Sequence, residues 1–330
     1  MNKSFWSDRR VFVTGCTGFL GSWLTAHLVD CGADVIGLVR DRVPRSLPVQ
    51  SGLINKITVV AGDIVDYHLV ERTLAEYEIE TIFHLAAQTI VTIANRAPLS
   101  TFETNIRGTW TLLEAARRNP TVQQVVVASS DKAYGSHKEL PYHEDMALLG
   151  SHPYDVSKSC ADLLARAYAN TYELPLVVTR FANIYGGGDL NWNRIVPGSI
   201  RSVLRGESPV VRSDGTPKRD YVFVQDAVNG YVTAAEQVPN ALVQGQTFNF
   251  GQDQPVPVIE IVETIIAQSN YPDLKPRILD QIQNEISDQY LDSRRAREVL
   301  GWRPQFTLEQ GLRQTMEWYS DFLSTDLPDK

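Results

Sequence analysis

The stretch Val11-Phe-Val-Thr-Gly-Cys-Thr-Gly-Phe-Leu-Gly21 places glycines at positions 15, 18 and 21, between an apolar strand and a helix that we expect to begin near Phe19. Glycines at such a turn allow backbone N–H groups to approach a pyrophosphate, and the helix N-terminus adds partial positive charge. A tight turn that needs glycine only for its backbone angles is the alternative. Because strand, glycines and helix coincide in the first unit of the chain, we interpret the stretch as a dinucleotide-binding loop.

Short β-branched runs alternate with amphipathic stretches through the first half of the chain, as in a parallel sheet with helices on both faces. This rhythm predicts an α/β fold with a Rossmann-type, doubly wound parallel sheet. Crossover helices are expected at Thr109–Arg118 and Ser157–Tyr172. The predicted strands are Val11–Val13, Asp34–Val39, Ile57–Val60, Thr81–His84, Val125–Ala128, Leu176–Thr179 and, further along, Thr247–Phe250.

After Arg180 the pattern changes to a glycine-rich loop at Tyr185–Asp189, a basic helix around Arg194–Arg205 and a turn at Ser213–Pro217. We expect a smaller α/β cap here, interleaved with the main domain and laid over the carboxyl edge of the sheet. The predicted division is residues 1–180 plus 220–252 for the dinucleotide-binding domain, and 181–219 plus 253–330 for a substrate-binding domain.

Composition narrows the class of protein. The 330 residues are 43% hydrophobic and 21% charged, which is typical of a globular enzyme, and no apolar run approaches the roughly 20 residues of a membrane span. The net charge of −8 argues against a nucleic-acid-binding surface. Cys16, Cys31 and Cys160 show no metal-ligand spacing, so no metal site is predicted. An odd set of free cysteines and no recognisable signal peptide predict a cytoplasmic protein.

Two positions bear on the adenosine end of the dinucleotide. At the end of the second strand, Arg40 suits a 2′-phosphate and Asp41 suits a 2′-hydroxyl, so NAD and NADP both stay open; both side chains could equally be solvated loop charges. After the third strand, Asp63 is placed either to reach the adenine or to cap the next helix near Tyr67.

Tyr154 and Lys158 lie four positions apart on a predicted helix that follows Pro153, so both side chains project from one face. An adjacent ammonium and a positively charged nicotinamide would favour the phenolate of Tyr154. A shift of about 3 pKa units requires roughly 4 kcal/mol of differential stabilisation. An exposed Tyr and Lys on an ordinary amphipathic helix is the alternative, and the glycine loop upstream favours the catalytic interpretation.

The fifth predicted strand ends in Ser130-Asp131-Lys132, and the carboxyl ends of parallel strands are where an open sheet presents reactive groups. Ser130 beside Tyr154 could hydrogen-bond a sugar hydroxyl that loses its proton, with Asp131 and Lys132 facing neighbouring ring positions. A polar turn after a buried strand, capped by Asp131, is the alternative.

Taken together, the chain resembles an extended short-chain dehydrogenase/reductase of the NAD-dependent epimerase/dehydratase family, over nearly its whole length. The segment Ser129–Gly135 and the loop Gly186–Asp189 are most similar to CDP-glucose 4,6-dehydratases, whereas Lys218–Ala227 is closer to epimerases and dTDP-glucose dehydratases. The motifs are TGCTGFLG (14–21), HLAAQ (84–88), TNIRGT (104–109), SSDKAYG (129–135), PYDVSK (153–158), RFANIYGGGD (180–189), KRDYVFVQDA (218–227) and LGWRP (300–304).

The resemblance implies a nucleotide-diphosphate-hexose 4,6-dehydratase with a tightly bound, recycled NAD or NADP. Phenolate Tyr154, supported by Ser130 and Lys158, takes the C4 hydroxyl proton while the C4 hydride passes to the nicotinamide. Asp131 is the acid at C6, and Lys132 stands where relatives carry the C5 base or stabilises the enolate. The implied cofactor-binding residues are Gly15, Thr17, Gly18, Phe19, Leu20, Gly21, Arg40, Asp63, Ile64, Leu85, Ala86, Ala87, Tyr154 and Lys158.

The substrate-binding residues implied are Gln88, Ser130, Asn183, Arg194 and Arg219, of which Asn183 and Arg219 match diphosphate positions. A helix-capping amide and a surface arginine are their alternatives. Arg180 and Arg201 are weaker candidates, and His84 is expected to be a hydrogen-bonded structural histidine. The resemblance also implies a homodimer through paired helices, here Thr101–Arg118 and Ser157–Tyr172.

Two other functions stay open. The first is a C4 epimerase or decarboxylase of nucleotide sugars, which needs only Ser130, Tyr154 and Lys158. The second is a dinucleotide-sensing regulator without chemistry, against which the intact Tyr154 and Lys158 pair counts.

Overall fold

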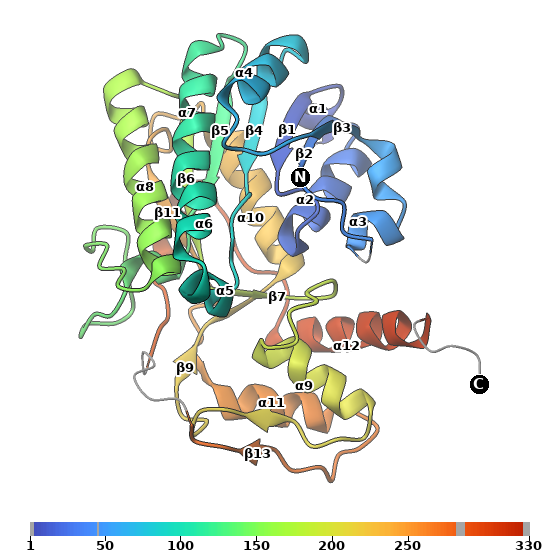
Figure 1. Cartoon of the computed structure of the whole chain (residues 1–330). Coiled ribbons are helices and arrows are strands. Elements are labelled where there is room, and N and C mark those ends of the chain that lie inside the picture. The colour runs from blue at the N-terminus through green and yellow to red at the C-terminus, as the bar shows by residue number, and fades with distance from the viewer. Residues whose placement is uncertain (1–2, 45, 282–287, 326–330) are drawn as a thin grey trace.

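The computed structural model describes residues 3–44, 46–281 and 288–325, and its centre is a seven-stranded sheet in which every paired neighbour is parallel (Figure 1). The predicted doubly wound Rossmann-type sheet is therefore confirmed. Each predicted strand forms, with ends shifted by two residues at most. Across the sheet the order is β11 (Thr247–Phe250), β6 (Leu176–Phe181), β5 (Gln124–Ala128), β4 (Thr81–His84), β1 (Arg10–Thr14), β2 (Asp34–Val39) and β3 (Thr58–Ala61).

Side chains alternate between two apolar layers, one on each face of the sheet. On β1, Phe12 joins the layer beneath α4 (Tyr67–Glu76), α7 (Gly108–Arg118) and α8 (Pro153–Tyr172), whereas Val11 and Val13 join the layer beneath α2 (Phe19–Asp30) and α10 (Val224–Gln237). Both predicted crossover helices are present within α7 and α8. Burial on both faces explains why these strands are nearly continuous apolar runs.

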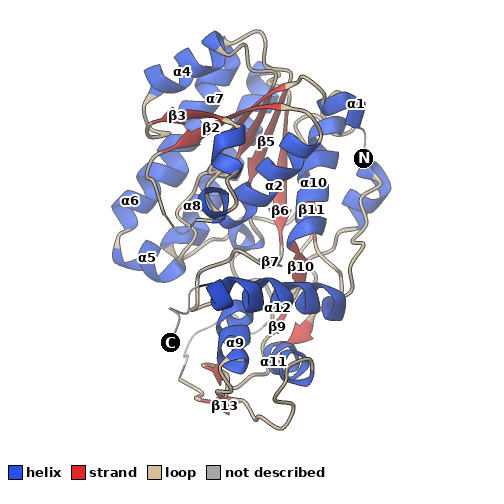
Figure 2. Cartoon of the chain, turned by 90° about the vertical axis from the view of Figure 1, so that its right-hand side faces the viewer, coloured by secondary structure: helices blue, strands red, loops and turns tan. Residues whose placement is uncertain are grey.

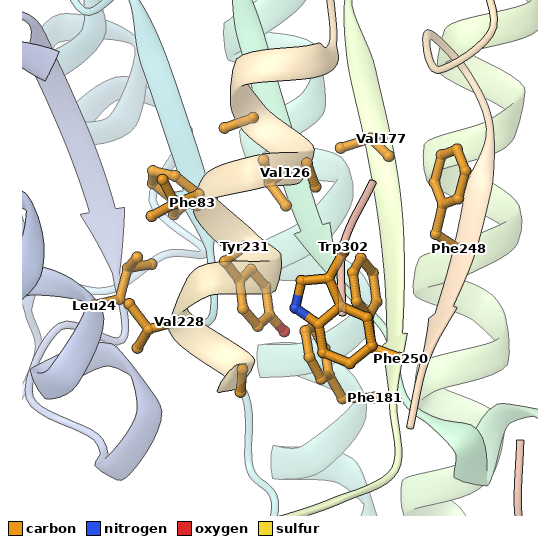
Figure 3. Packing of buried hydrophobic residues seen from close by; sticks show 14 of the residues in the cluster. Leu24, Phe83, Val126, Val177, Phe181, Val228, Tyr231, Phe248, Phe250 and Trp302 are labelled. Atoms are coloured by element: carbon orange, nitrogen blue, oxygen red, sulfur yellow. The ribbon is translucent and has the colours of Figure 1, made fainter. Parts of the chain in front are cut away.

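An aromatic cluster joins the β6–β11 edge of the sheet to α10 (Figure 3). Phe181 stacks on Phe250 with ring centroids 4.4 Å apart and on Tyr231 of α10 at 4.8 Å. Trp302, from the LGWRP motif, packs edge-on against Phe250 at 5.0 Å, and its Nε1 donates to the main-chain oxygen of Asp226. This motif therefore fastens a late segment of the chain to the sheet and does not reach the cavity.

A second body of helices lies beyond the carboxyl ends of the strands (Figure 2). It contains α9 (Ile195–Leu204), α11 (Val258–Ala267) and α12 (Leu308–Thr325), which share one buried cluster that includes Ile200, Ile265 and Leu312. Short pairs of strands lie at the border of this second body: β7 (Asn183–Tyr185) with β10 (Tyr221–Phe223), β8 (Val210–Val211) with β13 (Arg277–Ile278), and β9 (Lys218–Arg219) with β12 (Val256–Pro257). The predicted basic helix corresponds to α9.

The chain passes between the two bodies more than once, because β11 joins the main sheet after α9 and before α11. We propose that residues 1–180 plus 220–252 and residues 181–219 plus 253–330 are the two domains; residues 282–287 and 326–330 lie outside the described part. The remaining elements are α1 (Lys3–Trp6), α3 (Leu47–Gln50), η1 (Leu53–Lys56), α5 (Val91–Arg96), α6 (Pro98–Phe102), η2 (Glu103–Arg107), η3 (Asp131–Tyr134) and η4 (Ala296–Leu300).

None of the helices in the described residues combines the length and the apolar composition of a bilayer-crossing segment.

Candidate active site

A cavity of about 1100 Å³ separates the carboxyl ends of the strands from the cap, and all residues of the predicted catalytic, cofactor and substrate sets line it. Residues from the loops that follow β1 and β4, and from β5, α8, β7 and α9, meet around one space although they are spread over most of the chain. The lining includes the predicted cofactor set Gly15, Thr17, Gly18, Phe19, Leu20, Gly21, Arg40, Asp63, Ile64, Leu85, Ala86 and Ala87, the predicted catalytic set Ser130, Asp131, Lys132, Tyr154 and Lys158, and the predicted substrate set Gln88, Asn183, Arg194 and Arg219.

The glycine loop after β1 has the shape that a pyrophosphate requires. Gly15 has a φ of 75°, and a Cβ there would lie 2.8 Å from the backbone nitrogen of Ala86. A Cβ on Gly21 would lie 2.0 Å from the main-chain oxygen of Gly15. Gly18 is the N-cap of α2. Because Gly15 and Gly21 carry no side chain, neighbouring segments of backbone come close together at the N-terminus of α2. Such a loop suits a dinucleotide phosphate.

Replacing Gly21 with alanine is expected to weaken dinucleotide binding more than tenfold, about 1.4 kcal/mol, because the new methyl group displaces the loop at Gly15. Titration of the purified variant with NAD and NADP, followed by protein fluorescence, measures this loss. Ser51→Ala is the control, since Ser51 is exposed and lies outside the cavity lining. Equal affinities of the Gly21→Ala variant and wild type would contradict the assigned role of the loop.

The residues expected at the adenosine end stand at the rim of the same cavity. Arg40 and Asp41 form an exposed ion pair with 2.7 Å between Nε and Oδ2. Asp63 accepts from the backbone nitrogen of Val65 at 3.3 Å, so it closes a turn. The alternative that Asp63 caps the next helix is wrong: Asp66 is the N-cap of α4 and accepts from the backbone nitrogen of Leu69.

The turn after β5 carries the predicted Ser-Asp-Lys triplet. Ser130 caps η3 by accepting from the backbone nitrogen of Lys132, and its hydroxyl donates to Asp131 Oδ1 at 2.9 Å. The capping role that the alternative gave to Asp131 therefore belongs to Ser130. The Asp131 side chain is 4% exposed, no donor in the described residues hydrogen-bonds its Oδ2, and Lys132 Nζ lies 4.0 Å from that oxygen. A buried carboxyl oxygen without a donor is costly unless a ligand supplies the partner.

Tyr154 and Lys158 both lie on the first turns of α8, and both are buried. Burial raises the pKa of Tyr154 to about 12, although a hydrogen bond with Ser130 and the charge of Arg194 lower it. Among the protein's own groups, desolvation outweighs the nearby positive charge. The predicted phenolate also depends on the positive charge of the nicotinamide, and it stays a prediction. Lys158 Nζ donates to the main-chain oxygen of Ala128 at 2.7 Å, and burial lowers its pKa to about 8.

Among the predicted substrate residues, Asn183, Arg194 and Arg219 lie on the cap side, whereas Gln88 and Ser130 follow β4 and β5 of the main sheet. Asn183 Nδ2 donates to the main-chain oxygen of Asp220 at 3.2 Å, and Arg219 is 6% exposed with Nη1 on the oxygen of Lys218. Both alternatives, a helix-capping amide and a surface arginine, are therefore wrong. Arg194 pairs with Asp189 at 2.9 Å, so the GGGD loop holds it. The backbone nitrogen of Gln88 donates to Asn105 Oδ1 at 2.7 Å.

The three remaining residues that the sequence analysis considered are His84, Arg180 and Arg201, and only Arg201 lines the cavity. His84 accepts or donates through both ring nitrogens, to Thr14 at 2.9 Å and Thr109 at 3.0 Å, and burial lowers its pKa to about 3, so the structural interpretation is confirmed. Arg180 is buried outside the cavity lining in a two-point ion pair with Asp162, and its candidacy as a site residue is wrong. Arg201 lines the cavity and stacks over Trp192 at 4.8 Å.

Sequence reasoning missed several residues at the site. Trp192 and Arg212 line the cap side of the cavity, and Gln289 contacts both Asp131 and Lys132. No local pattern marks these residues, because each reaches the site through folding of the cap.

Known proteins share this arrangement. The family model described as GDP-mannose 4,6 dehydratase matches residues 12–315. A CDP-glucose 4,6-dehydratase of Salmonella typhimurium is 31% identical, covering 98% of this chain and 94% of that protein, and a UDP-glucose 4-epimerase of Mycolicibacterium smegmatis is 33% identical, covering 94% and 98%. The crystal structure of dTDP-glucose 4,6-dehydratase from Bacillus anthracis in complex with NAD superposes with a TM-score of 0.81 at 27% identity, covering 95% and 97%.

The parallel sheet, the glycine loop after β1, and Tyr154 and Lys158 at the cavity define an enzyme of the short-chain dehydrogenase/reductase type that uses a nicotinamide dinucleotide. Within this class, the chain belongs to the GDP-mannose 4,6 dehydratase family.

Proposed function

We propose that this enzyme is a nucleotide-diphosphate-hexose 4,6-dehydratase that converts a CDP-glucose-like substrate to its 4-keto-6-deoxy product. One observation carries the proposal: Asp131 is buried beside the Tyr154 wall with its Oδ2 lacking a hydrogen-bond donor in the described residues, and Lys132 lies next to it. Oxidation at C4 alone does not need this second pair of proton-transfer groups, whereas loss of water across C5 and C6 needs both an acid and a base.

Each described group has a proton-transfer task in this reaction. When bound, the nicotinamide supplies reversible oxidation at the sugar carbon. Tyr154 Oη takes the C4 hydroxyl proton, and Ser130, which hydrogen-bonds Tyr154, holds the same oxygen. Lys132 Nζ then takes the C5 proton, which the C4 ketone has made acidic. Asp131 gives a proton to the C6 hydroxyl, which leaves as water while a C5–C6 double bond forms. Lys132 returns the proton to C5 as C6 receives, from the bound dinucleotide, the hydride that C4 had given up.

Residues on the cap side would hold the nucleotide diphosphate. Arg219 is buried at the cavity wall, and a guanidinium can contact two phosphate oxygens at once. Asn183 and Gln88 supply uncharged donors nearby, while Arg194 adds a cation held by Asp189. We propose these four residues for the substrate and the glycine loop with Leu85–Ala87 for the cofactor.

Incubation of the purified protein with CDP-, dTDP-, GDP- and UDP-hexoses tests the function. We expect one of them to lose the mass of one water, about 18 units, with no net consumption of dinucleotide. Absence of a dehydrated product across the four would reject the proposal.

Epimerisation at C4 is the second candidate, since Arg219 lies in a segment closer to epimerases and the Mycolicibacterium smegmatis relative is named as one. Replacing Asp131 with asparagine and Lys132 with methionine separates the two functions. A dehydratase is expected to lose at least about a hundredfold in turnover, whereas an epimerase keeps most of it.

We also propose a homodimer through α7 and α8. These helices lie side by side (Figure 1), and they expose the large apolar side chains Trp110 at 45%, Leu163 at 52% and Tyr172 at 53%. Exposed apolar surface on paired helices is typical of an association surface.

Leu163→Glu is expected to convert the dimer to a monomer, because each copy would bury a charge in the same apolar contact. Light scattering after size-exclusion chromatography measures the mass. Leu242→Glu is the matched control, since Leu242 is 70% exposed on the segment between α10 and β11. A wild-type protein that elutes as a monomer would reject the dimer.

A further inference from the structure

Gln289 is a buried residue whose side-chain amide binds the Ser-Asp-Lys turn at two points. Its Oε1 accepts from Lys132 Nζ, and its Nε2 donates to the main-chain oxygen of Asp131 at 3.2 Å. The residue has no exposed surface. Because both ends of the amide are engaged, neither its rotation nor an exchange of its oxygen and nitrogen leaves the contacts satisfied. Gln289 is therefore held in one orientation, and it holds Lys132 in turn.

The main chain of Gln289 makes a separate contact with the cap. Its nitrogen donates to the main-chain oxygen of Lys218 at 3.0 Å, and the same oxygen accepts from Arg219 Nη1 at 2.9 Å. The backbone of Gln289 thus supports the strand that carries the proposed diphosphate arginine, while the side chain supports the proton-transfer turn. A substitution of the Gln289 side chain leaves the main-chain hydrogen bond to Lys218 in place.

We infer that Gln289 is a positioning residue for proton transfer at C5: its amide oxygen binds one N–H of Lys132 and so directs the nitrogen lone pair into the cavity. The inference rests on the proposed dehydratase function. In the step itself, the C5–H bond breaks, its electron pair forms the enolate with the C4 ketone, and the proton forms an N–H bond on the free-base form of Lys132. The resulting ammonium keeps its hydrogen bond to Gln289.

Several charged and titratable groups surround Lys132 and share in its protonation. Asp131 lies on the same turn, with 4.0 Å between Oδ2 and Nζ. Asp155 approaches from α8; burial raises its pKa, and the charge of Lys132 in its ammonium form lowers it. Arg219 belongs to the strand that Gln289 contacts. Among these partners Gln289 is the uncharged acceptor, so it fixes the position of Nζ without adding the negative charge that would favour the ammonium.

Gln289→Glu tests this balance, because it keeps the size and the acceptor but places a second carboxylate on Lys132. We expect the acid side of the kcat profile to move to higher pH by about one unit or more, with turnover recovering in alkaline buffer and KM for the nucleotide sugar within about twofold of wild type. An unmoved profile in an active variant would overturn the inference. Gln244→Glu is the matched control, since Gln244 is exposed and lies outside the cavity lining.

Gln289→Met keeps the test decisive if the glutamate variant does not fold. It removes the acceptor without adding charge, and we expect kcat to fall about tenfold or more with KM little changed. Deuterium uptake at C5 of the isolated 4-keto-6-deoxy product in D₂O gives a second readout, which depends on the base and not on oxidation at C4. Wild-type uptake in Gln289→Met would overturn the inference.

The same experiments distinguish failure of the proposed dehydratase function from failure of the role of Gln289. A wild-type protein that forms no dehydrated product rejects the proposed function and the role of Gln289 with it. A wild-type protein that dehydrates, beside Gln289 variants with unchanged pH profile, kcat and deuterium uptake, rejects the role of Gln289 alone.

Discussion

Tyr154→Phe is expected to lower kcat by about a thousandfold while the protein still folds and still binds its dinucleotide. The phenol oxygen is the group placed to take the sugar proton, and phenylalanine fills the same buried space without it. Burial raises the pKa of Tyr154 to about 12, so the protein's own groups favour the neutral phenol. Formation of the phenolate therefore depends on positive charge brought to the cavity by the bound dinucleotide.

Steady-state turnover and dinucleotide titration of the same preparation separate loss of chemistry from loss of binding. Tyr168→Phe is the matched control, because Tyr168 lies on the same helix and its hydroxyl reaches Glu114 outside the cavity. Near-normal turnover of Tyr154→Phe would remove the tyrosine from the mechanism. It would also revive the possibility of a dinucleotide-sensing protein without chemistry.

Arg180→Met is expected to lower the free energy of unfolding by about 3–5 kcal/mol. Arg180 binds Asp162 through Nε and Nη2 at 2.8 and 2.9 Å, and its Nη1 donates to Tyr134 and to the main chain of Glu144. Both side chains are at most 1% exposed. Methionine fills the volume but leaves the Asp162 carboxylate buried with Arg166 as its remaining cation. Urea unfolding measures the loss.

The double variant Arg180→Met/Asp162→Leu is expected to recover much of that stability, because it removes both buried charges together. Arg72→Met is the control for loss of an exposed ion pair, here with Glu76 on α4, and it should unfold close to wild type. If Arg180→Met unfolds at the same urea concentration as this control, the buried pair does not stabilise the fold.

Features that depend on short stretches of chain could be predicted from the sequence. The glycine loop, the strand ends and the spacing of Tyr154 and Lys158 are set by backbone angles and helix periodicity within a few residues. For this reason the predicted site residues line one cavity. The alternative that Asp63 caps the next helix was wrong by three positions, because Asp66 offers the same side chain at the helix start.

Features that depend on distant contacts could not be predicted. Lys132 and Gln289 are 157 positions apart, and Arg180 reaches Tyr134 across 46, so no local pattern links them. The strong effect of burial on the pKa of Tyr154 could not be predicted either. Sequence spacing shows which charges are near, but it does not show how completely the surrounding side chains exclude water, and here that exclusion dominates.

The alternating path of the chain between sheet and cap limits how such an enzyme can diversify. In the sequence, β11 of the main sheet lies between α9 and α11 of the cap. The cap is therefore not one continuous segment, and a single recombination event could not exchange it. New sugar preferences must then arise by substitutions within an intact scaffold. We expect such substitutions at residues that line the cavity from the cap, such as Trp192 and Arg212.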